Sequence, residues 1–199
     1  MKLYKEIEQG TEEWFEIRKG KMTASNAQCI GANGKGLETY IYTLLAEKYS
    51  NNKEIYTNKD MERGIELEEQ ARMVYEIEFE SVEQIGFCEM SEYVGASPDG
   101  LMDKKGLEIK CPNDTNYFKI LINGEKEIDQ KYLWQCQMNM LVCEKDEWDI
   151  AFYNPNFNKG LTVFTLKKNL MMQEKLIMGI EKGEKLIKSI ETQYANRNL

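Results

Sequence analysis

The chain has 199 residues, 42% of them hydrophobic and 30% charged, so it can bury one substantial core but is too short for two comfortable domains, and we expect a single domain over residues 1–199. Its net charge of −8 argues against a nucleic-acid binder, because Lys and Arg make the contacts to phosphate. The absence of histidine excludes Ser-His and Cys-His nucleophiles, and the five scattered cysteines argue against a disulfide framework, structural zinc or an iron–sulfur cluster.

The N-terminal third of the chain predicts helices. Residues 11–20 carry a Thr cap, an acidic first turn, a basic last turn and a glycine stop, which are typical of a short helix. Thr23 or Ser25 can cap a second helix. Apolar residues recur at helical spacing over residues 37–49, and a longer helix is predicted over 60–78.

The rest of the chain alternates strands with helices. Short alternating segments between residues 82 and 109 predict a three-stranded antiparallel meander. A helix is expected over 130–143, strands over 148–153 and 161–166, and a closing amphipathic helix from 168 to about 193. This order implies an α/β fold in which a central mixed sheet is flanked by helices.

The run Ser97-Pro98-Asp99-Gly100-Leu101 is the first candidate for chemistry. Proline at its second position and glycine at its fourth are typical of a type I turn. The segment Leu107-Glu108-Ile109-Lys110 alternates apolar with charged residues, so Glu108 and Lys110 share one face of a half-buried strand. Pairing of the two segments brings Asp99 beside Glu108, and such oxygen sites bind hard divalent cations. On spacing alone, a solvated turn and a charged outer hairpin face explain these residues equally well.

A glutamate on the apolar face of the predicted helix 60–78 is the second candidate. At about 100° per residue, Glu68 falls in the same sector as Leu67, Ala71, Val74 and Tyr75. A carboxylate aimed at the core is costly unless it is paired or binds a metal. The competing explanation is a buried salt bridge to Arg72.

A glutamine in the predicted helix 130–143 is the third candidate. The same projection places Gln137 among Leu133, Met140 and Leu141, so it faces inward. A buried amide needs hydrogen-bond partners, which a metal-bound water, a carboxylate or a substrate phosphate would provide. A structural hydrogen bond to the backbone explains the position equally well.

Basic residues form two small clusters. They are Arg18, Lys19 and Lys21, and Lys104, Lys105 and Lys110. A solvated surface explains clusters of this size, although local charge can differ from the net charge. Because histidine is absent, hydrolysis by this chain would need a metal.

Together these features resemble the lambda exonuclease and YqaJ-like viral recombinase group of PD-(D/E)XK nucleases, over about residues 14–153. The resemblance rests on segments in the family's order: Trp14 to Arg18 leading to Thr23-Ala24-Ser25, the helix with Arg63-Gly64, Glu68 and Ala71-Arg72, the run from Ser97 to Leu101, Glu108-Ile109-Lys110, and the helix with Gln135 and Gln137. It implies a restriction-endonuclease-like core.

The resemblance also implies a role for each candidate at the metal. Asp99, Glu108 and the Ile109 carbonyl would ligate Mg²⁺, with Mn²⁺ as a possible substitute. Glu68 would complete the metal site, and Lys110 would orient or activate water.

For the remaining candidates, the resemblance implies roles around this centre. Gln137 would support the centre from its helix. Arg18 and Ser25 look like the family's pocket for the 5′-phosphate of the degraded strand, which suits the forked donors of arginine and a hydroxyl. Gln135 is expected among the residues that contact DNA.

The implied reaction is stepwise 5′ to 3′ hydrolysis of one strand of linear double-stranded DNA, which leaves a 3′ single strand. By analogy with processive members of the group, we expect a homotrimer around DNA and a single-strand annealing protein as partner, in a phage or prophage setting. No apolar run approaches the ~20 residues that cross a bilayer, and the charged N-terminus lacks a signal peptide's apolar region. We therefore expect no membrane partner and the bacterial host cytoplasm as the location.

Two alternatives remain open at this point. Another PD-(D/E)XK nuclease, an endonuclease or a single-strand nuclease, would use the same metal chemistry. A non-catalytic acidic protein that mimics DNA would fit the net charge, but the intact Asp99, Glu108 and Lys110 oppose it.

Overall fold

The computed structural model describes the backbone of residues 1–51 and 59–197 and the side chains of residues 1–51 and 66–197. Its strands form two mixed four-stranded sheets, in the orders β1-β3-β4-β2 and β5-β6-β7-β8. The strands are β1 (Lys2–Tyr4), β2 (Met22–Thr23), β3 (Phe87–Ser91), β4 (Val94–Ala96), β5 (Gly100–Leu101), β6 (Lys105–Lys110), β7 (Glu147–Tyr153) and β8 (Leu161–Lys167). The helices are α1 (Glu12–Arg18), α2 (Ala27–Ala32), α3 (Lys35–Tyr49), α4 (Lys59–Glu78), α5 (Asp114–Asn123), α6 (Gln130–Val142) and α7 (Leu170–Arg197), with 3-10 turns η1 (Ala24–Asn26) and η2 (Gly124–Glu127).

The chain changes sheets at the turn that holds Asp99. β3 and β4 form an antiparallel hairpin in the first sheet, whereas β5 and β6 pair in the second, with Gly100 opposite Leu107. The predicted three-stranded meander is therefore wrong. Pro98 lacks the N–H that would continue the ladder from β4. The mixed α/β class with flanking helices is confirmed, but its strands divide between two sheets instead of forming one.

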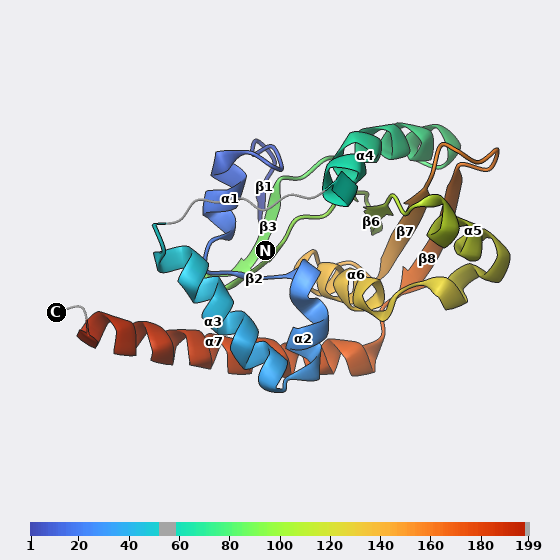
Figure 1. Cartoon of the computed structure of the whole chain (residues 1–199). Helices are drawn as coiled ribbons and strands as arrows, with labels where there is room; N and C mark the ends of the chain where they lie inside the picture. Colours follow the sequence, from blue (N-terminus) through green and yellow to red (C-terminus); the bar gives the residue numbers. More distant parts are fainter. Residues whose placement is uncertain (52–58, 198–199) are drawn as a thin grey trace.

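Helices cover both faces of the second sheet. β6 lies at its centre, antiparallel to β5 and parallel to β7, with Glu108 opposite Ile150. Leu107 and Ile109 pack with Tyr75 of α4 on one face. Ile150 belongs to the larger core that includes buried residues of α6. In Figure 1, α4 lies above β6 and α6 lies below it. Glu108 therefore comes from the central strand, between two helices that can add side chains to it.

Two glycines allow close packing beneath α6. A Cβ atom on Gly179 of α7 would lie 1.9 Å from the main-chain oxygen of Ile30, so only glycine fits against α2 there. A Cβ atom on Gly31 would lie 2.3 Å from the ring of Trp134 on α6. In Figure 1 the long α7 runs along the bottom of the view and passes behind α2 and α3. These contacts fix α6, and hence the side chains it directs at β6.

Most predicted elements are confirmed, with ends shifted by a few residues. Thr11 caps α1 by accepting a hydrogen bond from Trp14 N at 3.3 Å. Neither Thr23 nor Ser25 caps a helix through its side chain, because η1 precedes α2. The sequence prediction missed α5, whose N-cap Asn113 follows a proline and resembles a turn. Among the described residues, no helix has the length and apolar character needed to span a membrane.

Candidate active site

The β5–β6 hairpin brings Asp99 against the central strand. Asp99 N donates to Leu107 O at 3.2 Å, and Asp99 Oδ2 accepts from Ile109 N at 2.5 Å. These two bonds flank Glu108 on β6, so the predicted proximity of the two carboxylates is confirmed. Lys110 Nζ lies 2.5 Å from Glu108 Oε1, which confirms that Glu108 and Lys110 share one face of the strand.

Glu108 is 2% exposed and is held by donors from two elements. Its Oε1 atom accepts from Lys110 Nζ and from Gln135 Nε2, both at 2.5 Å. Its Oε2 atom accepts from Asn139 Nδ2 at 2.9 Å. Gln135 and Asn139 are one helical turn apart, so their amides lie on one face of α6. These three donors satisfy a carboxylate that would be costly to bury without them.

Helix α4 supplies the third carboxylate. Glu68 is half-buried, with 35% of its side chain exposed, and its Oε1 atom pairs with Arg72 Nη2 at 2.7 Å. The salt bridge considered as the competing explanation is thus present. Arg72 Nε also donates to the main-chain oxygen of Asp99 at 3.1 Å, so the pair joins α4 to the Asp99 turn. Charge interaction with Glu108 and Lys110 further indicates that Glu68 belongs to the same cluster.

The cluster carries more negative than positive charge. Burial, followed by repulsion from Glu108 and Glu68, raises the pKa of Asp99 well above its usual range. Burial also raises the pKa of Glu68, although Arg72 opposes this shift. For Lys110, burial disfavours the charged form, but Glu108 and Asp99 outweigh it and the pKa is raised above its ordinary value. Lys110 therefore stays an ammonium ion, and the excess negative charge would attract a further cation.

The donor set fits a hard divalent metal ion. Asp99, Glu108 and Glu68 offer carboxylate oxygens, and Ile109 offers a main-chain oxygen beside them, as Mg²⁺ and Mn²⁺ prefer. The carboxylates are not yet gathered around one point: within the described side chains, no group of three acidic, cysteine or histidine residues is close enough to hold a metal. The Lys110 ammonium ion lies against Glu108 instead.

Gln137 is buried as predicted, at 4% exposed, but it does not reach this centre. Its Nε2 atom donates to Lys167 O at 2.9 Å, and its Oε1 atom accepts from Asn169 N at 2.9 Å and from Gln173 Nε2 at 3.0 Å. The prediction that Gln137 supports the catalytic centre is therefore wrong. A projection shows that a side chain faces inward without showing which partner it meets, and α6 is buried on more than one side.

The amides that do reach the centre are Gln135 and Asn139. The sequence prediction assigned Gln135 to DNA and missed Asn139. The available signal was their i, i+4 spacing, which places two amides on one face of a helix. A contact between Gln135 and DNA stays a prediction.

Arg18 ends α1, and its side chain is partly buried. Its Nη1 atom donates to Ser97 Oγ at 2.8 Å, and the group lies 4.0 Å from the centroid of the Trp14 ring. Trp14 Nε1 also donates to Ser97 Oγ at 2.9 Å. Ser97 thus joins Arg18 to the turn that holds Asp99. Burial lowers the pKa of Arg18 to about 10, which leaves it charged near neutral pH, and no described carboxylate pairs with it.

A chain of contacts through Thr23 and Tyr40 links Ser25 to Arg18. The hydroxyl of exposed Ser25 is 3.2 Å from Thr23 Oγ1, and Thr23 N donates to Tyr40 Oη at 3.1 Å. Tyr40 in turn interacts electrostatically with Arg18. Arg18 and Ser25 are thus both linked to Tyr40, Arg18 by a charge interaction and Ser25 through Thr23. Tyr40 could not be singled out from the sequence, because a tyrosine at helical spacing is usually part of a core.

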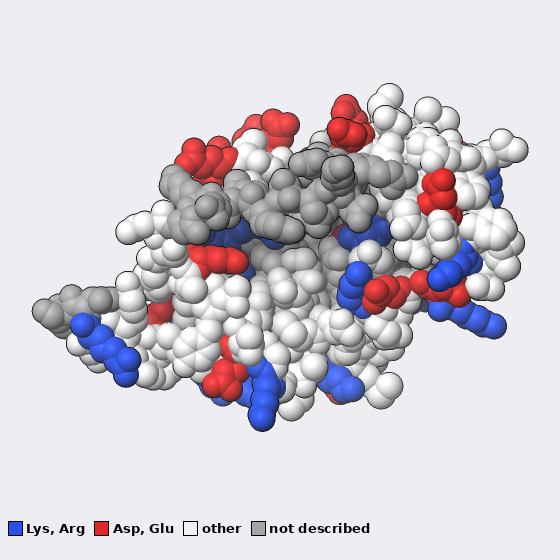
Figure 2. Space-filling view, in the orientation of Figure 1, with Lys and Arg blue, Asp and Glu red and all other residues white. Residues whose placement is uncertain are grey.

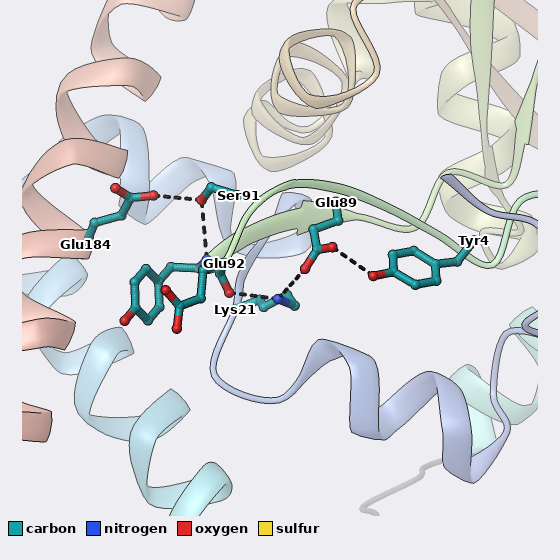
Figure 3. Close-up of polar contacts among 7 residues, drawn as sticks. Tyr4, Lys21, Glu89, Ser91, Glu92 and Glu184 are labelled. Carbon is teal, nitrogen blue, oxygen red and sulfur yellow. Dashed lines mark hydrogen bonds and ion pairs between the residues drawn. The ribbon is translucent and has the colours of Figure 1, made fainter. Parts of the chain in front are cut away.

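The two lysines that follow Arg18 in the sequence, Lys19 and Lys21, form ion pairs with glutamates. Lys21 Nζ bonds Glu89 at 2.7 Å, and Glu89 also accepts from Tyr4 at 2.8 Å, as Figure 3 shows. In the same hairpin Ser91 donates to Glu184 of α7 at 2.7 Å.

The two predicted basic clusters therefore offer few free charges. Lys19 pairs with Glu16, and Lys105 bonds Asp149 at 2.6 Å. On the face drawn in Figure 2, outside the grey residues, acidic and basic side chains are intermixed and do not form one basic patch. The motif residues Arg63 and Gly64 lie outside the described side chains.

Comparison with known proteins agrees with this geometry. An alkaline exonuclease (LHK-Exo) from Laribacter hongkongensis, solved alone and in complex with dAMP, matches with a TM-score of 0.79 and 27% identity, over 94% of this chain and 99% of that chain. A phage-related exonuclease from Haemophilus somnus 129PT shares the fold, with a TM-score of 0.69 at 14% identity over 87% and 96% of the two chains. No curated protein matches. The sequence matches the model of the YqaJ-like viral recombinase domain over residues 13–146, and the chain therefore belongs to that family.

Proposed function

We propose that this protein is a metal-dependent exonuclease that degrades one strand of linear duplex DNA in the 5′ to 3′ direction from a 5′-phosphate end. Family membership and the likeness to an alkaline exonuclease make the chain a nuclease of the exonuclease type. The observation that carries the metal-dependent part of the proposal is the acidic cluster of Asp99, Glu108 and Glu68, in which the Lys110 ammonium ion lies against Glu108.

Asp99, Glu108 and the main-chain oxygen of Ile109 would hold Mg²⁺ or Mn²⁺, with Glu68 completing the set. When bound, the ion would polarise the phosphoryl oxygen and lower the pKa of a water molecule, which removes the need for histidine. Lys110, charged and 21% exposed, orients or activates the attacking water. Gln135 and Asn139 hold the Glu108 carboxylate in place.

The surroundings of Arg18 support recognition of a 5′-phosphate. A partly buried guanidinium ion without a described carboxylate partner favours an anion, and arginine binds phosphate through two parallel hydrogen bonds. Ser25 and Ser97 add hydroxyl groups nearby. Because Ser97 is two residues from Asp99, the terminal phosphate would be held close to the bond that is cleaved. The similar enzyme LHK-Exo has been solved with dAMP, a nucleoside monophosphate of the kind that stepwise hydrolysis releases.

The acidic surface is consistent with a protein that holds DNA by enclosing it. A homotrimeric ring around the duplex would lessen the need for a broad basic face. The family further supports a phage or prophage origin, action in the bacterial cytoplasm, and a single-strand annealing protein that receives the exposed 3′ strand.

Digestion of four DNA substrates tests this function. Linear duplexes with 5′-phosphate or 5′-hydroxyl ends, a closed circle and a single strand are incubated with Mg²⁺, with and without EDTA. Mononucleotides released mainly from the phosphorylated duplex, and lost with EDTA, are expected. Cleavage of the circle would indicate an endonuclease, and preference for the single strand would indicate a single-strand nuclease. No cleavage with any metal would favour a binding protein.

A further inference from the structure

The two oxygens of Glu108 are used unequally. Oε1 accepts two hydrogen bonds, from Lys110 and Gln135, which fill both of its lone pairs. Oε2 accepts one described hydrogen bond, from Asn139 at 2.9 Å. One lone pair of Oε2 therefore remains for another ligand.

Asn139 has a single described side-chain partner. It is 0% exposed, its Nδ2 atom donates to Glu108, and its buried Oδ1 atom has no hydrogen-bond partner among the described residues. Burying a half-satisfied amide is unfavourable, and such groups call for an explanation. Gln137, the other buried amide of α6, instead uses both its nitrogen and its oxygen to join α6 to the connection between β8 and α7. The Asn139 amide therefore serves Glu108 rather than the assembly of the fold.

We propose that Asn139 is a positioning residue for the divalent cation. It fixes the Glu108 carboxylate so that the remaining lone pair of Oε2 is the one offered to the metal. Gln135, one turn earlier, holds Oε1, so a single rigid helix sets the position of both oxygens. The inference rests on the proposed function, because it takes Glu108 as a metal ligand. Partners that orient metal ligands typically contribute 10- to 100-fold in affinity.

Binding of Mn²⁺ to the DNA-free protein tests this role without relying on activity. Asn139→Leu keeps the number and branching of the side-chain heavy atoms but cannot donate to Glu108. We expect its Mn²⁺ dissociation constant, measured by electron paramagnetic resonance, to rise about 10- to 100-fold. Asn139→Ala is measured in parallel, in case the leucine variant does not fold, with the same expected result. Circular dichroism verifies the fold of each variant.

Gln137→Leu is the matched control, because it removes a buried amide from the same helix. It should unfold at a lower temperature than the wild type and keep its Mn²⁺ dissociation constant within about twofold. Unchanged Mn²⁺ affinity in a folded Asn139 variant would overturn the positioning role and leave the proposed function intact. Equal losses in the Asn139 and Gln137 variants would also overturn it, since the effect would then be general packing. Failure of the wild-type protein to bind any divalent cation would contradict the proposed function itself.

Discussion

Neighbouring strands β6 and β7 each carry a buried carboxylate, and the two differ in their surroundings. Asp149 of β7 is 1% exposed and lies on the face covered by α4. It accepts from Tyr75 Oη at 2.5 Å and from Lys105 Nζ and Thr165 Oγ1 at 2.6 Å. These three donors come from α4, β6 and β8, so Asp149 joins the second sheet to its covering helix.

Glu108 of β6 also accepts from three donors, so hydrogen bonding alone does not distinguish it from Asp149. The difference lies in the nearby acids. Glu108 has Asp99 and Glu68 within its electrostatic reach, and their pKa values are raised by burial and by repulsion from Glu108. The acid beside the Asp149 network is Glu80, which is 49% exposed and pairs with Lys105 at 3.1 Å. Both buried carboxylates have a lysine partner, but two further acids lie near Glu108. We propose that a cation from solution balances this extra negative charge, whereas Asp149 serves the stability of the fold.

Removal of the cation in the Glu108 cluster should have the largest effect on cleavage. Lys110→Ala is expected to lower the rate of mononucleotide release at least about 100-fold, as for loss of a proton-transfer or water-orienting group. Lys104→Ala changes an exposed lysine in the same hairpin and should keep the wild-type rate. Release is measured with fluorescently labelled linear duplex. A folded Lys110→Ala variant with near wild-type activity would contradict the assignment of the centre.

Substitution of Arg18 should have an intermediate effect that depends on the DNA end. Arg18→Ala is expected to slow digestion of 5′-phosphorylated duplex about 10- to 100-fold, the value of a hydrogen-bonded charge. Digestion from a 5′-hydroxyl end should change little. Arg18→Lys keeps the charge but cannot form two parallel hydrogen bonds to phosphate, so its rate should lie between those of Arg18→Ala and the wild type. Equal losses on both ends would show that Arg18 acts on folding or on chemistry rather than on the terminal phosphate.

Substitution of Asp149 should have the smallest effect on cleavage and a clear effect on stability. Asp149→Asn removes the charge that pairs with Lys105 and weakens the bonds from Tyr75 and Thr165, so we expect the free energy of unfolding to fall by about 2 kcal/mol. The rate per folded molecule should stay within about twofold of the wild type. Urea denaturation and the duplex digestion assay measure the two quantities. A large loss of rate without loss of stability would break the distinction between the two carboxylates.

The site residues on β6 and its hairpin were predicted from the sequence more accurately than those on helix α6. The two-residue period of a strand places Glu108 and Lys110 on one face whatever surrounds them, and the Pro-Asp-Gly turn places Asp99 at the neighbouring strand. Both predictions depend on local geometry alone. The change of sheet at Pro98 was missed because the alternation of residues does not tell which strand a segment joins.

On helix α6 the sequence prediction chose the wrong amide. Gln137 and Asn139 are both buried, since α6 contacts the second sheet on one side and α2 and α7 on others. Hydrophobic periodicity identifies the buried face of a helix only when the opposite face is exposed to solvent. For Glu68 the apolar sector was informative, since the competing explanation, a salt bridge to Arg72, is present. Metal binding by Glu68 stays a prediction.

Cation binding to two isosteric variants tests the central claim most directly. Glu108→Gln and Asp149→Asn each remove one buried negative charge, and Mg²⁺ binding to both is measured by isothermal titration calorimetry beside the wild type. We expect at least about a 10-fold loss of affinity in Glu108→Gln and wild-type affinity in Asp149→Asn. Wild-type affinity in folded Glu108→Gln would contradict the central claim.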